Sequence, residues 1–269
     1  MLGAEAPLRA VFSMPTPAQL ATGLEPAAGH ESVGHENAGI LLPLRPTGDG
    51  APLFCVHAGY GVGFEYLNLS RCLPDQRLYG IGPRGLRGGE LPGSLPEMAA
   101  DYVQQIRTVQ ATGPYYLLGW SFGGMVAQEM AVQLREAGQQ VAALILVDSY
   151  PRRDLSGVHG NPENEREEQR MSQLFTGEER DAYLKVVKNS AKILREHRVR
   201  MIDGDLLLVS GVNAEDSAIE QWSSCVSGEV RRAKVDCSHD DMMSNADAVQ
   251  MIGEEVVEYL ASAAPRGKP

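Results

Sequence analysis

Leu117-Leu118-Gly119-Trp120-Ser121-Phe122-Gly123-Gly124 is the stretch that decides the fold of this chain. It contains the pattern G-x-S-x-G, which forms a nucleophile elbow where a strand turns sharply into a helix. In such a turn the backbone of the serine is strained, and the strand and the helix approach each other closely. Small residues are therefore needed on both sides of the serine, and Gly119, Gly123 and Gly124 meet that need.

The residues around this stretch strengthen the prediction, because the pattern alone also occurs by chance. An apolar run that begins at Tyr115 predicts a strand before the turn. Apolar residues follow the turn at helical spacing: Met125, Met130, Ala131 and Leu134. Since the turn aims the first amides of the helix at the space above Ser121, we predict that Ser121 is a nucleophile and that the Phe122 N–H donates to an anion formed there.

Predicted strands and helices alternate on both sides of this turn. The strands are predicted at Ile40–Leu44, Leu53–Val56, Leu78–Ile81, Tyr115–Leu118, Val141–Val147, Asp205–Ser210 and Glu229–Val235. The helices are predicted at Phe64–Leu73, from the capping box Ser94-Leu95-Pro96-Glu97 onward, and at Gly124–Ala137, Asp216–Val226 and Ala246–Ala261. This alternation is typical of an α/β fold with a mostly parallel sheet, right-handed crossovers and helices on both faces.

The segment at about 150–201 interrupts the alternation. No strand is predicted in it, and a polar stretch is followed by a helix with four apolar residues on one side: Leu184, Val187, Ala191 and Leu194. Insertions of this kind commonly form a lid over an active site. Another face of the helix carries a basic stripe of Lys185, Lys188, Lys192 and Arg195, which is either an ordinary solvated face or a docking surface for an acidic partner.

A nucleophilic serine needs a base, and six histidines are available. Four lie where a rigid catalytic group is not expected: His30 and His35 in a Gly-rich stretch, and His159 and His197 in the predicted lid. His57 ends an early strand. His239 lies between the last strand and the last helix, and it completes the chain order Ser, Asp, His that the elbow fold requires, so we predict His239 as the base.

Two aspartates compete for the role of the acid that orients this base. Asp148 ends the apolar strand at Val141–Val147, at the carboxyl edge of the sheet where ligands bind in such folds. A carboxylate there is costly to keep ionised without a partner, and an imidazole is such a partner. Asp216, after the next main strand, is the alternative, and we favour Asp148.

Composition excludes several classes of function. A formal charge of −11 and a pI near 5.0 argue against a nucleic-acid partner. The cysteines, Cys55, Cys72, Cys225 and Cys237, form no C-x-x-C pair, which predicts reduced thiols and neither a metal site nor a disulfide framework. The sequence shows neither a membrane-spanning run nor a signal peptide, so we expect a cytoplasmic domain without a membrane partner. We further expect the domain to be monomeric and bacterial.

Three of these motifs together resemble a known family. Gly119–Gly124, Val147-Asp148-Ser149 and Ser238-His239-Asp240-Asp241-Met242 are similar to the α/β-hydrolase thioesterase domains that end nonribosomal peptide synthetases. The likeness covers Ile40 to about Ala261 and implies an α/β-hydrolase fold with a helical lid. Cys237 departs from the family pattern, which often has Gly two residues before the histidine.

The stretch Phe54-Cys55-Val56-His57-Ala58-Gly59-Tyr60-Gly61 is similar to the oxyanion loop of that family. The resemblance implies that one amide of this loop, of Ala58 or of Gly59, joins that of Phe122 in an oxyanion hole. It also implies that His57 is a structural neighbour of the site and not a member of the triad.

Near the N-terminus, Pro7–Phe12 and Pro15–Ala21 resemble the last helices of a peptidyl carrier domain, without its phosphopantetheine-bearing serine motif. We expect a carrier remnant at 1–25, a linker at 26–39, a thioesterase domain at 40–262 and a disordered tail at 263–269. The implied partner is an upstream peptidyl carrier domain in cis, whose phosphopantetheine arm delivers the substrate. No cofactor or metal is expected to bind this domain itself.

The activity implied by the resemblance is release of a carrier-bound peptidyl or depsipeptidyl chain through an acyl-enzyme on Ser121. Macrocyclisation is favoured over hydrolysis, because the long lid segment is suited to enclose a folded chain and exclude water. A stand-alone editing thioesterase or esterase would use the same triad. A non-catalytic module that binds an acyl carrier is the alternative of a different class, and the complete set of triad residues argues against it.

Overall fold

The computed structural model describes residues 40–60, 62–151, 169, 172, 173, 175, 177–214 and 216–263. The carrier-like segment expected at 1–25, the linker expected at 26–39 and residues 152–168 of the expected lid lie outside the described residues. So does the tail expected at 263–269, except for Ala263, which is the last residue of a helix.

A seven-stranded sheet forms the centre of the domain. Its strands are β1 (Leu41–Arg45), β2 (Leu53–Val56), β3 (Leu78–Ile81), β4 (Tyr115–Trp120), β5 (Val141–Val147), β6 (Leu206–Ser210) and β7 (Val230–Lys234), in the order β1-β3-β2-β4-β5-β6-β7. Only β1 is antiparallel to its neighbour in this sheet. The prediction of a mostly parallel sheet is confirmed.

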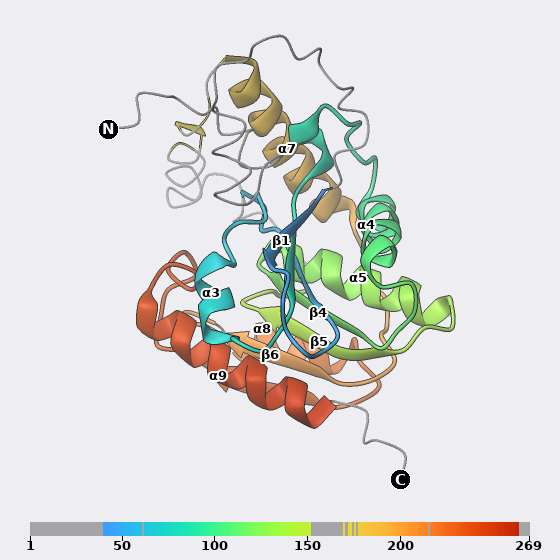
Figure 1. Cartoon of the computed structure of the whole chain (residues 1–269), viewed down its shortest axis with the longest axis vertical. Helices are drawn as coiled ribbons and strands as arrows, with labels where there is room; N and C mark the ends of the chain where they lie inside the picture. The colour runs from blue at the N-terminus through green and yellow to red at the C-terminus, as the bar shows by residue number, and fades with distance from the viewer. Residues whose placement is uncertain are drawn as a thin grey trace.

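Helices cover both faces of the sheet (Figure 1). They are α3 (Leu67–Cys72), α4 (Leu95–Val109), α5 (Phe122–Glu136), α7 (Gly177–Glu196), α8 (Asp216–Ser223) and α9 (Ala246–Ala263), with a short 3-10 helix η2 (Arg84–Arg87). Side chains of α4 and α5 join one apolar core, and those of α3 and α9 join a second core on the opposite face. Figure 1 shows α7 at the end of the molecule opposite α9.

Alternation along the strands divides the apolar residues between the two cores. In β2, Phe54 and Val56 face the core of α4 and α5, whereas Leu53 and Cys55 face the core of α3 and α9. β5 is buried on both faces, as its apolar sequence predicts. All four cysteines are unpaired. None of the helices in the described part of the chain has both the length and the apolar character of a membrane span.

Three helices differ from the prediction. α8 ends at Ser223 and not at Val226, where the backbone pairs with Ile202. α3 begins at Leu67 and not at Phe64, because the residues before it belong to a loop that is held by other contacts. The predicted buried face of α7 is also wrong in part. Three of the four residues assigned to it, Leu184, Ala191 and Leu194, are only half-buried. Its buried residues are Tyr183, Val186, Val187, Ser190 and Ile193, because α7 packs against η2 at one level and reaches the core of α4 and α5 at another.

Contacts at both ends tie α7 to the rest of the domain. Near its start, Tyr183 stacks on Phe175 and donates a hydrogen bond of 3.1 Å to the carbonyl of Tyr60. Just beyond its end, Arg200 donates to both carboxylate oxygens of the buried Glu129 in α5, at 2.7 and 3.1 Å. The helical part of the expected lid is therefore anchored to the loop after β2 and to α5.

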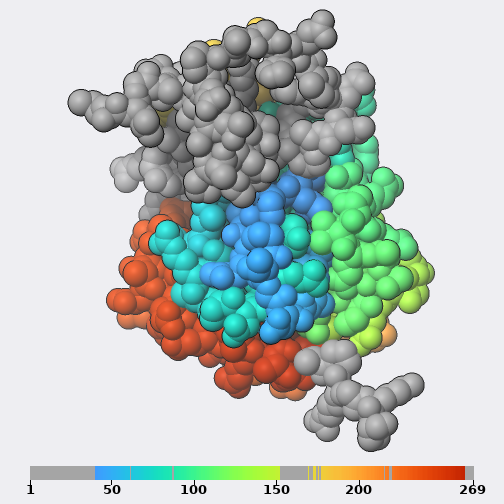
Figure 2. Space-filling model, viewed as in Figure 1, coloured from blue at the N-terminus to red at the C-terminus, as the bar shows by residue number. Residues whose placement is uncertain are grey.

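β1, the first described strand, lies at one edge of the sheet. Figure 2 shows the blue residues of this region flanked by the cyan segment that contains α3 and by the green segment that contains α4. Leu41 pairs with Ile81, the last residue of β3, so β1 begins at the carboxyl edge of the parallel strands.

Candidate active site

Ser121 lies between the end of β4 and the start of α5, in the sharp turn that the sequence predicts. Its φ and ψ of 57° and −124° are strained for a residue with a side chain. Its N–H donates to the carbonyl of Val147 at 2.9 Å, which ties the turn to β5. Added Cβ atoms would collide with Gly123 O at Gly119, with Val56 O at Gly123, and with Ser149 at Gly124. The predicted need for these glycines is confirmed.

The structure brings together the three residues predicted as the triad. His239 Nε2 lies 3.0 Å from Ser121 Oγ, and His239 Nδ1 lies 2.6 Å from Asp148 Oδ2. The side chain of His239 is 37% exposed and that of Asp148 only 11%, so solvent reaches the base but scarcely reaches the acid. The ring of Trp120 lies beside that of His239, with centroids 5.4 Å apart. Cys237, which replaces the family's glycine, is buried in the core of α3 and α9 and does not displace His239.

Asp148 follows β5 directly and has a φ of 42°, a left-handed conformation that aspartate tolerates better than most residues. Its Oδ1 accepts from the Tyr150 hydroxyl at 2.7 Å and from the Gly211 N–H at 3.1 Å, while its Oδ2 accepts from His239. Burial alone would raise the pKa of the Asp148 carboxyl, but the bonds from His239, Tyr150 and Gly211 outweigh it, and the pKa is lowered. Asp148 is therefore an anion that is held in one orientation.

Asp216, the alternative acid, lies elsewhere. It is exposed in the first turn of α8 and makes no contact with His239 among the described residues. Of the two aspartates weighed from the sequence, the structure places only Asp148 beside the base.

His57 is buried and takes no part in this relay. Its Nδ1 lies 2.7 Å from the carbonyl of Ala58, which can only accept, so Nδ1 carries the proton and Nε2 accepts from the Tyr102 hydroxyl at 2.8 Å. Burial lowers the pKa of His57 to about 4, so its ring is neutral near pH 7. Of the other histidines, His197 is described and lies just after α7, whereas His30, His35 and His159 lie outside the described residues.

The loop after β2 approaches the elbow closely. A Cβ on Gly59 would lie 3.6 Å from the Cβ of Phe122. The N–H of Ala58, one of the two loop amides considered for an oxyanion hole, donates to Glu65 Oε1 at 2.8 Å. Within the described part of the chain, neither the Gly59 N–H nor the Phe122 N–H has an acceptor. These two amides remain available to an anion at Ser121.

Sequence reasoning missed three residues that shape this site: Glu65, Tyr66 and Tyr150. Tyr66 donates to the carbonyl of Val56 at 2.6 Å and accepts from the Trp120 N–H at 2.9 Å, which links the end of β2 to the elbow. For Glu65, the one signal in the sequence was its acidic side chain beside apolar neighbours in a Gly-rich loop. The prediction that α3 begins at Phe64 obscured this signal. Nothing marks Tyr150 in the sequence except that it lies two residues from Asp148.

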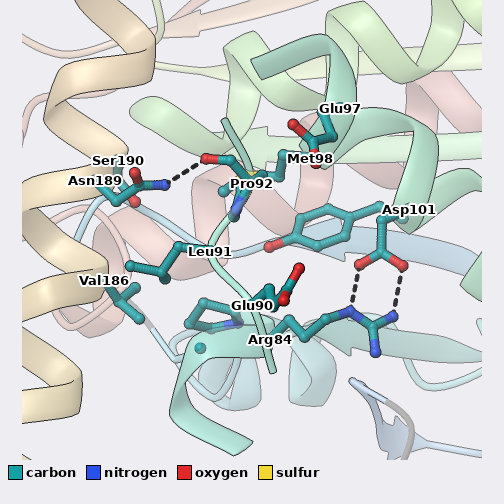
Figure 3. A pocket seen from close by; sticks show the side chains of 13 residues that line it. Arg84, Glu90, Leu91, Pro92, Glu97, Met98, Asp101, Val186, Asn189 and Ser190 are labelled. Atoms are coloured by element: carbon teal, nitrogen blue, oxygen red, sulfur yellow. Dashed lines mark hydrogen bonds and ion pairs between the residues drawn. The ribbon is translucent and has the colours of Figure 1, made fainter. Parts of the chain in front are cut away.

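A cavity of about 230 Å³ lies where α7 meets η2 and α4, and its lining contains no member of the triad (Figure 3). Figure 3 shows the Arg84 guanidinium beside the Asp101 carboxylate and the Asn189 side chain bonded to the carbonyl of Pro92. Tyr102, which bonds to His57, also lines the cavity. Among the described residues, no group of three or more His, Cys, Asp or Glu side chains could hold a metal ion.

This arrangement defines a class of protein. A serine on a strained elbow, an imidazole within hydrogen-bond reach and an oriented carboxylate together can remove the serine proton, and the sheet that carries them has the order and direction of an α/β-hydrolase fold. Residues 51–255 match the family model described as the thioesterase domain, and the chain therefore belongs to that family.

Curated relatives are large synthetases. The chain is 38% identical over 280 residues to malpinin synthetase from Mortierella alpina, a match that covers 97% of this chain and 4% of that protein. It is 32% identical over 280 residues to a dimodular nonribosomal peptide synthase from Bacillus subtilis, with 90% of this chain and 11% of that protein covered. The chain thus spans only a small part of the length of these relatives.

Solved structures agree with the family. The NocB thioesterase domain from the nocardicin cluster superposes with a TM-score of 0.68 at 25% identity, covering 82% of this chain and 99% of that one. The surfactin thioesterase domain SrfTE superposes with a TM-score of 0.64 at 20% identity, covering 79% and 91%, and this likeness shows the shared fold.

Proposed function

We propose that this domain releases a peptidyl or depsipeptidyl chain from a carrier through an acyl-enzyme on Ser121, and that the normal outcome is macrocyclisation. The observation that carries the proposal is the hydrogen-bonded relay from Ser121 Oγ to His239 at 3.0 Å and from His239 to Asp148 at 2.6 Å. The matched family and the synthetase relatives support the same assignment.

In this proposal His239 takes the Ser121 proton as Oγ attacks the carbonyl carbon of the thioester. The negative charge then moves to the carbonyl oxygen, which the amides of Phe122 and Gly59 stabilise. His239 returns the proton to the departing thiolate as the carbon–sulfur bond breaks, and an ester on Ser121 remains. A second nucleophile attacks that ester after giving its proton to His239, and Ser121 leaves as the hydroxyl.

The thioester is proposed to arrive on the phosphopantetheine arm of a peptidyl carrier domain upstream in cis. The relatives support this, because the aligned segment makes up only 4% and 11% of the length of the two synthetases. Their remaining length leaves room for such domains. No cofactor or metal held by this domain enters the mechanism.

Macrocyclisation is proposed because an amine or hydroxyl of the acyl chain can outcompete water when it is held near the ester. A well-oriented intramolecular nucleophile reaches effective molarities of about 10⁵ M or more. α7 packs on the loop after β2, which lies against the elbow at Gly59: the carbonyl of Tyr60 accepts from Tyr183, and the buried side chains of Val62, Phe175, Tyr183 and Val187 form an apolar cluster between the two segments. In this proposal the segment that contains α7 encloses the folded chain next to that loop and excludes water.

A panel of peptidyl and depsipeptidyl thioesters with a free terminal amine or hydroxyl tests this outcome. We expect cyclic products, lighter than the linear acids by one water, for chains long enough to reach back to Ser121. Mass analysis separates the products, and trapping of the acyl-enzyme shows that Ser121 was acylated. Linear acid as the sole product at every chain length, with Ser121 acylated, would make this a hydrolytic release enzyme.

The basic stripe on α7 is proposed to contact an acidic face of the carrier. Lys185, Lys188, Lys192 and Arg195 are all exposed in a chain whose formal charge is −11. Changing the three lysines to glutamine should lower kcat/KM for transfer from a separate carrier by about 5- to 20-fold at low salt, because charges at the rim of an interface act mainly on the association rate. Hydrolysis of a small soluble thioester should be unchanged.

The charge-preserving variant with the three lysines changed to arginine is the matched control, and it should keep normal transfer. Equal transfer by the glutamine and arginine variants would assign the stripe to an ordinary solvated face.

A further inference from the structure

We propose that Glu65 is a positioning residue of the oxyanion hole: its carboxylate holds the loop 58–63 so that Gly59, and not Ala58, offers its N–H to the oxyanion. This inference rests on the function proposed above. It goes beyond it in assigning a role to a side chain outside the triad and in choosing between two amides.

The Glu65 carboxylate accepts hydrogen bonds from three backbone amides of one loop. Its Oε1 accepts from the Ala58 N–H at 2.8 Å, and its Oε2 accepts from the N–H groups of Val62 and Gly63 at 3.2 and 2.7 Å. Among the described residues, no Lys, Arg or His forms an ion pair with Glu65. Burial raises the pKa of the Glu65 carboxyl, and the three amide bonds oppose that rise. The side chain fixes both ends of the loop at once.

Because the Ala58 N–H is bonded to Glu65, it is not available as a donor to the oxyanion. An N–H that points at a carboxylate oxygen 2.8 Å away cannot also point at an oxygen bound above Ser121. The next amide along the chain is that of Gly59, and a Cβ on Gly59 would lie 3.6 Å from the Cβ of Phe122.

His57 fixes the direction in which the Gly59 N–H points. The carbonyl of Ala58 and the N–H of Gly59 belong to one planar trans peptide group, so they point in opposite directions. Because His57 Nδ1–H donates to the Ala58 carbonyl at 2.7 Å, and Tyr102 holds His57 from its other nitrogen at 2.8 Å, the peptide cannot rotate freely. Ala58 is thus held at its N–H by Glu65 and at its carbonyl by His57.

The variant Glu65→Gln tests the role of the carboxylate with little change in shape. A glutamine has one acceptor oxygen, so its NH₂ group must face at least one loop amide, and the loop loses the bond to Ala58 or the pair to Val62 and Gly63. We expect kcat/KM for a small acyl thioester to fall about 10- to 100-fold, with KM nearly unchanged, since loss of one oxyanion donor costs about 10²- to 10³-fold. The affinity for a boronic acid that forms a tetrahedral anion on Ser121 should fall by the same factor.

Glu129→Gln is the matched control. Glu129 is also a carboxylate that accepts several hydrogen bonds, here from Arg200 and Gln133, and it lies two turns into α5, away from the loop. This variant should lower thermal stability while kcat/KM and boronic acid affinity stay at the wild-type values. The same result for Glu65→Gln, lower stability with full kcat/KM, would overturn the inference.

A measurement on the wild-type domain covers the case in which Glu65→Gln does not fold. When the boronic acid is added, we expect the amide protons of Gly59 and Phe122 to shift in the NMR spectrum, and that of Ala58 to keep its position. A shift of Ala58 without one of Gly59 would overturn the inference alone. Failure of the boronic acid to bind Ser121 at all would overturn the proposed function as well.

Discussion

Ser121→Ala is expected to lower turnover of an acyl thioester by a factor on the order of 10⁴ to 10⁶, because Ser121 Oγ is the atom that bonds to the acyl group in the acyl-enzyme. Alanine also carries a Cβ, so it meets the same backbone strain at a φ of 57° as serine does. The fold should therefore survive. The measurement is kcat/KM on a small soluble thioester, with thermal unfolding as the check on the fold.

A fluorophosphonate gives the companion result for Ser121. It should modify the wild-type domain at the peptide that contains Ser121 and leave Ser121→Ala unlabelled. If the variant kept a tenth of wild-type turnover, Ser121 would not be the nucleophile, and a binding module or a different active residue would have to be considered.

Asp148→Asn is expected to lower the rate by a factor on the order of 10⁴ through the wrong tautomer of His239. The surroundings of Asp148 decide how the asparagine orients. Two donors, Tyr150 OH and Gly211 N–H, point at the position of Oδ1, so the amide oxygen should lie there and the NH₂ group should face His239 Nδ1. His239 would then carry its proton on Nε2 and could not accept the proton of Ser121.

Asp216→Asn serves as the control for this prediction. Asp216 is exposed on α8, so its change should alter kcat/KM by less than about twofold, in line with other exposed substitutions. A larger loss for Asp216→Asn than for Asp148→Asn would move the acid to the loop after β6.

Much of the fold could be predicted because its signals are local. β5 is a continuous apolar run that only a strand buried on both faces accommodates, and its predicted bounds, Val141–Val147, are those observed. The capping box at Ser94 predicts the start of α4, and the Ser94 side chain accepts from the Glu97 N–H at 3.2 Å. The elbow was predictable because its G-x-S-x-G pattern is local, although two of its glycines are required by distant segments: Gly123 lies against Val56 and Gly124 against Ser149.

The candidate triad could also be predicted from the sequence, because the carboxyl ends of parallel strands lie at one edge of the sheet. Asp148 follows β5 directly and His239 follows β7, so the topology alone brings them near Ser121. The choice between Asp148 and Asp216 depended on that geometry, because both residues follow a strand.

The remaining features depend on contacts between segments that are distant in sequence. The buried face of α7 is set by η2 and by the core of α4 and α5, and Leu184 and Val187 alone do not show which neighbour lies where. In the same way, the choice between Ala58 and Gly59 depends on which amide a carboxylate at Glu65 reaches in three dimensions. Periodicity carries no information about either contact.

Because β1 runs antiparallel to β3, the chain enters the sheet at the edge where Ser121 lies. A carrier fused ahead of Ile40 would therefore be tethered on the catalytic side, and its linker would not have to run the length of the strands, about 20 Å. A short flexible tether gives effective concentrations in the millimolar range. A carrier held at such a concentration fills a docking surface of weak affinity and still leaves quickly after each transfer. Loss of the lysine contacts on α7 should then be visible with a separate carrier and nearly silent with a fused one.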